Sequence, residues 1–162
     1  MSIYMHFRAV PAEAITEDHA WLTQFMLAAW ERHSEEFASG ITTSINKDFE
    51  WLHLLYAGAA EESWGEPNTL PIEGGHVIHD LTNANPPFLI LDPDQVRATA
   101  VFLQTVSFDT RWHIAGPHLS AQIHGWNEGQ VKDFYRDHHH DLRDFYQAAA
   151  TAGHAVIKGF WV

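Results

Sequence analysis

Residues 127–162 read N-E-G-Q-V-K-D-F-Y-R-D-H-H-H-D-L-R-D-F-Y-Q-A-A-A-T-A-G-H-A-V-I-K-G-F-W-V, and this stretch indicates the fold class. Asn127 with Gln130 three residues later is a helix start signal, and we expect the helix to run to about residue 152. Gly153 is placed to end it, and residues 155–162 are then a strand rich in β-branched and aromatic side chains. The helix carries one apolar stripe at spacings of three and four: Val131, Phe134, Tyr135, His138, Leu142, Phe145, Tyr146 and Ala149.

Similar signals predict four further helices. The sequence Asp92-Pro93-Asp94-Gln95 combines a cap, a first-turn proline and a capping-box partner, and it starts a helix that runs to about residue 106. Thr16 can cap a helix over residues 17–38. Residues 48–57 are apolar nearly all round, which indicates a buried helix. A short helix is expected over residues 107–113.

The expected strands include one at each end of the chain and two in its middle. Besides the C-terminal strand, residues 2–10, 76–78 and 88–91 are predicted strands, whereas residues 39–46, 59–71 and 115–126 are predicted to be loops or irregular. This order predicts an α/β fold: a small central mixed sheet with the N- and C-terminal strands, layered with helices as a three-layer α/β/α-like sandwich. A length of 162 residues without a linker or repeat predicts a single domain, residues 1–162.

Charge and cysteine content narrow the partners and the location. The formal net charge is −12, which repels phosphate backbones and anionic lipid, so we expect neither nucleic acid nor membrane as a partner. A basic protein or peptide, a metal ion and a neutral small molecule stay open, as does the oligomeric state. The chain has no cysteine, which excludes disulfides and thiolate chemistry. It shows no signal-peptide pattern and no apolar stretch approaching 18 residues, so the expected location is the cytoplasm.

Four segments of the sequence match the landmarks of a known family in their order. They are residues 45–58 around Leu52-His53, the turn at residues 71–75, the helix start at residues 91–96, and the end of the last helix with Gly153. In order and spacing they resemble the YfbM-like family of bacterial domains of unknown function. The chain departs from that family's pattern at Phe49, where Trp is usual, and at His124-Gly125-Trp126, where a Tyr-Pro pair usually precedes the Trp. The resemblance implies an α/β layered fold and brings no assigned activity or catalytic residue.

Thirteen histidines are the feature that points to chemistry, because imidazole titrates near neutral pH and is the commonest metal ligand. His53 lies beside Glu50 in the expected buried helix. It is either a core residue hydrogen-bonded to a loop or a general base or ligand at the edge of a pocket. His76 and His79 follow a pair of glycines. They could converge only if the chain turned at Ile78, and a structural turn is the alternative.

The remaining candidates lie in the second half of the chain and in one loop. His113, His118 and His124 lie in or beside residues 115–126 and could gather a metal, although their spacing matches no local motif. Residues 137–141, D-H-H-H-D, are expected to form a largely solvated helix face, with His138 half-buried on the apolar stripe. The pairs with ligand spacing on this face are His140 with Asp144, Asp137 with His140 or Asp141, and His138 with Asp141. Trp64 is expected to be the most exposed tryptophan. The candidate pocket therefore comprises His53, Glu50, His76, His79, Trp64, His124 and Trp126.

Two functions remain open at this point. The first is a small cytoplasmic binding or interaction domain without assigned catalysis, whose partner is a protein or a small molecule. The alternative is a histidine-based metal-binding protein or metal-dependent enzyme, holding a divalent transition metal through His113, His118, His124, His140 and Asp144. A third hypothesis, a pH-responsive protein, follows from the histidine content alone. Neither a Gly-x-Ser-x-Gly nor a His-Glu-x-x-His sequence is present, so the sequence assigns no enzyme class.

Overall fold

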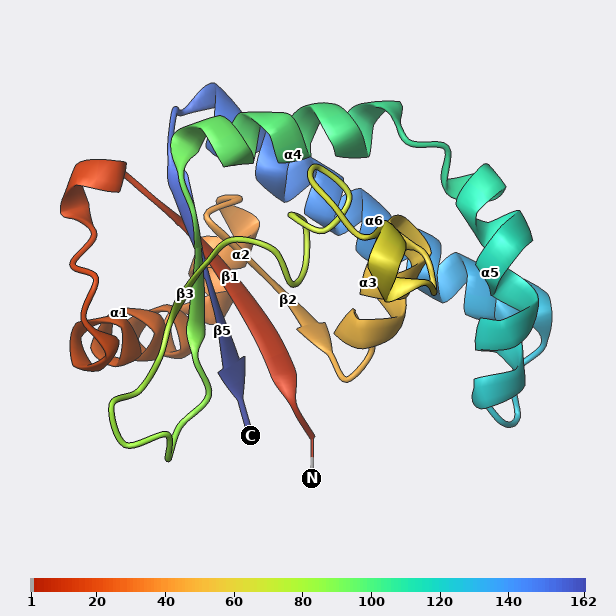
Figure 1. The fold of residues 1–162 in the computed structure, drawn as a ribbon, viewed down its shortest axis with the longest axis horizontal. Coiled ribbons are helices and arrows are strands. Elements are labelled where there is room, and N and C mark those ends of the chain that lie inside the picture. Colours follow the sequence, from red (N-terminus) through yellow and green to blue (C-terminus); the bar gives the residue numbers. More distant parts are fainter. Residues whose placement is uncertain (1) are drawn as a thin grey trace.

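The computed structural model describes residues 2–162, and a five-stranded sheet lies at its centre (Figure 1). The strands are β1 (Tyr4–Val10), β2 (Thr42–Asn46), β3 (His76–Ile78), β4 (Phe88–Leu91) and β5 (Ala155–Trp161), in the order β2-β1-β5-β4-β3. The N- and C-terminal strands, both predicted from the sequence, pair with each other from Tyr4 opposite Trp161 to Val10 opposite Ala155. The α/β class is confirmed. One detail differs from the mixed sheet we expected, because every pairing between described strands is antiparallel.

Helices cover both faces of the sheet (Figure 1). On one face, α1 (His19–Glu31) buries Leu22 and Met26 against side chains of β1, β4 and β5. On the other face lies the larger core, to which α3 (Phe49–Ala57), α4 (Pro93–Thr105), α5 (Phe108–Gln122) and α6 (Glu128–Thr151) contribute. The alternation of side chains along β1 and β5 divides them between the two cores. The three-layer arrangement is therefore present.

Most helices begin where the sequence predicts. The capping boxes of α4, at Asp92 and Gln95, and of α6, at Asn127 and Gln130, are both formed. The helix predicted over residues 17–38 is instead two helices, α1 and α2 (His33–Ala38), and Asp18 rather than Thr16 caps the first. Two short 3-10 turns, Ala12–Ala14 and Glu61–Ser63, complete the elements. Within residues 2–162 no helix is both long and apolar enough to cross a membrane.

Two segments predicted as loops are regular. Strand β2 occupies most of residues 39–46, because the β-branched Thr42 and Thr43 are buried together with Ile45. Helix α5 continues through Gly116-Pro117, where we expected irregular backbone. A Cβ on Gly116 would lie 2.6 Å from the Trp112 indole nitrogen, so this glycine is required for the ring to pack against its own helix. The glycine marks a close contact there and does not break the helix.

Candidate functional site

The residues of the predicted pocket lie in three separate places. His53, Glu50 and Trp64 lie near the loop that follows α3, and His76 and His79 lie at β3 and just after it. His124 and Trp126 lie in the connection between α5 and α6. The structure therefore does not gather the predicted pocket into one site, and each place is described separately.

His53 is a buried side chain on α3, with 2% of its surface exposed. Its ring stands edge-on to Trp64, with centroids 4.6 Å apart, and its Nε2 lies 3.8 Å from a Glu73 carboxylate oxygen. Burial lowers the pKa of His53 to about 4, and the charge of Lys158 adds to this effect. The expectation that Trp64 is the most exposed tryptophan is wrong. Its indole N–H donates to the Gly58 carbonyl at 2.7 Å, and the ring is half-buried against His53.

Lys158 lies inside β5 and is fully buried. The segment that follows α3, residues 58–75, passes over it. The Nζ of Lys158 donates to the carbonyl oxygens of Leu70, Ile72 and Gly74 at 2.8, 2.7 and 2.7 Å. Burial holds the pKa of Lys158 well below its usual range, and the Glu73 carboxylate only partly opposes this shift. Three acceptors use three N–H groups, which only the ammonium form has. The ammonium is therefore fully engaged, with no lone pair for nucleophilic chemistry, and its evident role is to hold the loop against the sheet.

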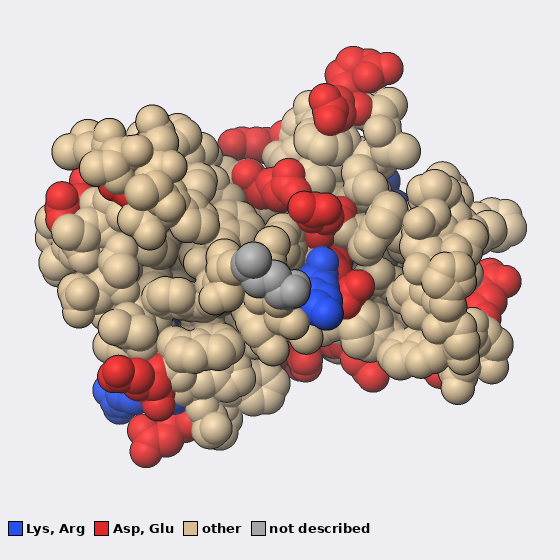
Figure 2. Space-filling view, turned by 90° about the horizontal axis from the view of Figure 1, so that it is seen from below, with Lys and Arg blue, Asp and Glu red and all other residues tan. Residues whose placement is uncertain are grey.

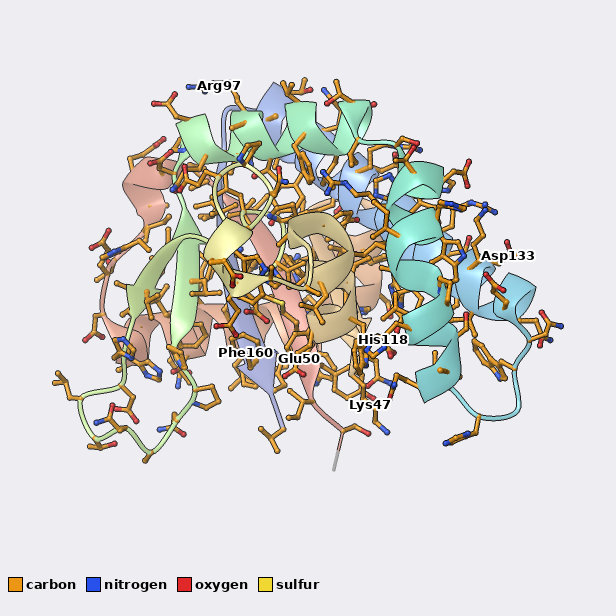
Figure 3. All side chains as sticks on the ribbon, turned by 45° about the vertical axis from the view of Figure 1, so that its right-hand side comes forward. Lys47, Glu50, Arg97, His118, Asp133 and Phe160 are labelled. Atoms are coloured by element: carbon orange, nitrogen blue, oxygen red, sulfur yellow. The ribbon has the colours of Figure 1, made fainter. Side chains whose placement is uncertain are left out.

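The candidate metal ligands do not converge. His118, labelled in Figure 3, lies on α5 with its ring 5.9 Å from that of Trp51. His113 lines a hollow of about 690 Å³ between α5 and the start of α6. His124 is exposed, and so are His140 and Asp144 on α6. Within residues 2–162, no three His, Asp or Glu side chains come close enough together to hold a metal ion.

The histidine run on α6 is not simply a solvated face. His139 is buried, whereas His138 is half-buried and His140 exposed. The Tyr56 hydroxyl lies 2.8 Å from Nδ1 of His139, and burial lowers the pKa of His139 to about 4. The ring is therefore neutral at pH 7, and its Nδ1 can accept a hydrogen bond from the Tyr56 hydroxyl. His138 is half-buried, as expected from its place on the predicted stripe, whereas the burial of His139 was not predicted.

A concave site lies elsewhere, between the start of α1 and the loop that joins β3 to β4. An outer hollow of about 560 Å³ is lined by residues between 17 and 24 and between 78 and 85. An inner hollow of about 230 Å³ adjoins it, since the two share His19, Thr23 and Asn85. The inner hollow is further lined by Pro86, Phe88, Phe160, Trp161 and Val162. We call the two hollows together the His19 cleft. Phe160, labelled in Figure 3, marks its end on β5.

The His19 ring is fixed between the two hollows. Its Nε2 lies 2.9 Å from the Pro86 carbonyl, to which it donates, and the ring centroid lies 4.9 Å from that of Phe88. With the proton on Nε2, a neutral His19 has its acceptor at Nδ1, 3.5 Å from the Thr23 hydroxyl. This tautomer leaves Nδ1 as an acceptor beside Thr23, which also lines both hollows.

The rim of the cleft is also ordered by hydrogen bonds. Asp80 accepts from the backbone N–H and hydroxyl of Thr82 and from the backbone and side-chain N–H groups of Asn85, at 2.8 to 3.2 Å. These bonds hold the pKa of Asp80 well below its usual range, so the carboxylate is charged. Strand β3 ends at Ile78, and His79 lines the outer hollow. His76 Nε2 lies 3.7 Å from Glu17, which lines the same hollow.

Comparison with known proteins identifies the family. The family model described as a domain of unknown function, DUF1877, matches residues 1–158. The chain belongs to the DUF1877 family. Its fold is similar to the crystal structure of YfbM, a protein of unknown function from Escherichia coli, with a TM-score of 0.60 at 14% sequence identity. That match covers 98% of this chain and 99% of the other. No curated protein matches the sequence.

The His19 cleft of this DUF1877 domain shares the negative charge of the surface. Acidic side chains are spread over the face drawn in Figure 2, whereas basic ones are confined to small spots, in keeping with the net charge of −12. The outer hollow follows this pattern, with Glu17, Asp18 and Asp80 among its lining residues. His19, which joins both hollows, was not predicted from the sequence. The signal available was its place directly after Asp18, the residue that caps α1.

Proposed function

We propose that this DUF1877 domain is a binding domain without catalysis of its own, which holds a small molecule or a short peptide segment in the His19 cleft. The observation that carries this proposal is the place of His19, which lines both hollows and is fixed by the Pro86 carbonyl. Ligand sites are typically concave and largely pre-formed, with apolar walls and a few fixed polar groups. The inner hollow supplies such walls and the rim supplies the polar groups. The lack of cysteine fits a reducing compartment, and we place this function in the cytoplasm.

A fragment screen followed by ¹⁵N–¹H correlation spectra tests this proposal. We expect the chemical shift changes to cluster on residues 17–24 and 78–88. His19→Ala should weaken the binding of any cleft ligand by about tenfold, which corresponds to about 1.4 kcal/mol. His140→Ala is the matched control, because His140 is exposed on α6 and should leave binding unchanged. Shift changes that map instead to the hollow between α5 and α6 would contradict the proposal.

A further inference from the structure

Strand β3 is the last strand of the sheet, at the edge opposite to β2, so only one of its two sides is paired (Figure 1). Its partner is β4, with Val77 opposite Leu89. In an antiparallel pair, alternate residues direct their backbone N–H and C=O groups towards the partner strand and away from it. The groups directed away belong either to Val77 or to both of its neighbours, His76 and Ile78. Within residues 2–162, no hydrogen bond outside the β3–β4 pair reaches them.

The side chains of β3 show what lies on each face of this edge. Ile78 lies opposite Phe88, a residue of the core beneath α1, and packs against that core, so it faces α1. The outer hollow of about 560 Å³ is lined by Ile78 and by the first residues of α1, which places the hollow on this face. Val77 faces the opposite side, as Leu89 does, and 39% of its surface is exposed. A side chain placed beyond Val77 would therefore cover apolar surface.

The sequence of β3 does not block this edge against a further strand. Exposed edges are commonly blocked by Lys or Pro, by a bulge, or by a helix laid over them. The sequence His76-Val77-Ile78 has neither residue type, and β4 is the only described helix or strand that packs extensively against it. Unpaired backbone groups beside an exposed apolar side chain and a hollow are the features of a site for β-strand addition. In that mode, main-chain hydrogen bonds give affinity and alternate side chains enter pockets.

The length of β3 and the charge of the chain decide which occupant fits the edge. Three residues span about 10 Å and offer the outward hydrogen-bonding groups of only one or two residues. A stable contact between two folded proteins needs roughly 1,200 Å² of buried surface, far more than so short an edge supplies. Two copies of this chain would also each bring a charge of −12. An extended peptide needs no such area, because it pairs with the edge and fills the adjoining hollow at the same time.

We infer that the ligand of the His19 cleft is an extended peptide segment, which pairs with the free edge of β3 as a sixth strand and places one of its side chains in the outer hollow. This inference rests on the proposed function and decides between the two ligand classes that it leaves open. A side chain on the other face of the peptide then lies over Val77. The main chain supplies the affinity, and the hollow selects the side chain.

A blocked heptapeptide, acetyl-Lys-Thr-Val-Thr-Val-Thr-Lys-amide, tests the inference against a copy of itself whose five central backbone nitrogens are methylated. The two probes share their side chains and their charge, and only the first retains the N–H groups that a strand donates. Each is titrated into the ¹⁵N-labelled full chain. We expect the unmodified peptide to bind at least tenfold more tightly, to shift residues 76–82, and to give backbone NOEs to β3. The outward amides of β3 should exchange more slowly when it is bound.

One substitution on β3 and a matched one elsewhere test the place of the added strand. Val77→Ser removes apolar surface that the peptide covers and leaves the backbone groups of β3 in place. We expect it to raise the Kd of the unmodified peptide by about threefold to tenfold, because less apolar surface is buried in the complex. Val101→Ser is the control, since Val101 is 63% exposed on α4 and lines neither hollow of the cleft, and it should leave the Kd unchanged.

The outcomes separate the inference from the function on which it rests. If the unmodified peptide does not bind, if the methylated one binds as tightly, or if Val77→Ser leaves the affinity unchanged, the inference is overturned, whereas binding of fragments in the cleft stands. If the free chain dimerises in light scattering and shows concentration-dependent shifts in β3, a second copy occupies the edge and the inference is again overturned. If neither the peptide nor any fragment shifts a cleft residue, both the inference and the proposed function fail.

Discussion

Replacing Lys158 by Met is the sharpest test of how the loop after α3 is held. The substitution keeps most of the apolar stem of the side chain and removes the ammonium group. The carbonyl oxygens of Leu70, Ile72 and Gly74 then lose a donor at 2.7 to 2.8 Å. Two of these hydrogen bonds are fully buried and the third is partly buried, so water cannot easily replace the donor.

The expected loss follows from opposing effects. A hydrogen bond to a charged group contributes about 1.5–3 kcal/mol, and an unpaired buried acceptor costs about 1–3 kcal/mol. Against these stands the cost of taking an ammonium group out of water, several kcal/mol, which the Met variant no longer bears. We expect a net loss of about 3–5 kcal/mol in the free energy of unfolding, a large share of the stability of an ordinary domain.

Urea unfolding followed by circular dichroism measures this loss, and amide hydrogen exchange locates it. The N–H of Gly74 donates to the Thr69 carbonyl and that of Leu70 to the Pro67 carbonyl, so their exchange should accelerate in the variant. Lys47→Met is the control, because Lys47 is exposed, and it should change stability by less than about 0.5 kcal/mol. A loss below about 1 kcal/mol for Lys158→Met, with unchanged exchange in the loop, would refute the assigned role of the ammonium.

Two further predictions concern pH and packing. Burial, with His33 and Arg8 nearby, lowers the pKa of His6 from 6.5 to about 4 in the folded state, so the unfolded chain takes up the proton first. Proton uptake by the unfolded chain therefore lowers the free energy of unfolding as the pH falls from 6.5 towards 4. Above pH 6.5, His6 is neutral in both states and causes no such loss. His6→Leu should therefore reduce the pH dependence of the unfolding free energy in that window, by up to about 1.4 kcal/mol per pH unit, and an unchanged slope would count against it. Gly116→Ala should cost about 1–3 kcal/mol, because its Cβ would meet the buried Trp112 ring, whereas Gly65→Ala has open space and should be nearly neutral. Thermal or urea unfolding distinguishes the two glycines, and equal stability would show that the ring can move aside.

The parts of the fold that the sequence predicted are those with a local cause. The capping boxes at Asp92 and Asn127 use side chains three residues apart, so a short sequence pattern suffices to find them. Strand β2 could not be found in this way, since its buried polar residues lie in a strand that packs against α2 and against α6, far along the chain. The second half of α5, which was predicted to be irregular, was missed because Gly116 fits a ring contact, a cause that a sequence pattern does not show.

The candidate site was predicted less well, for a related reason. The turn after Ile78 was weighed from the sequence, and His79 lines the outer hollow next to it. His19 became a candidate only when α1 and the β3–β4 loop were placed side by side, 67 residues apart at the His19–Pro86 hydrogen bond. Lys158 was hidden because a lysine within a strand is usually exposed, and only the fold brings three loop carbonyls to it.

The histidine content, which first suggested metal chemistry, has a different physical meaning in this structure. Burial lowers the pKa values of His6, His53 and His139 to about 4, so at neutral pH these rings act as uncharged polar aromatics within the core. Their burial makes the domain sensitive to acid without requiring any ligand. His19 differs from them, because it is partly exposed, is oriented by a backbone carbonyl and lines both hollows of a cleft. A search for function among the histidines should therefore begin at His19, where a ring is both fixed and accessible.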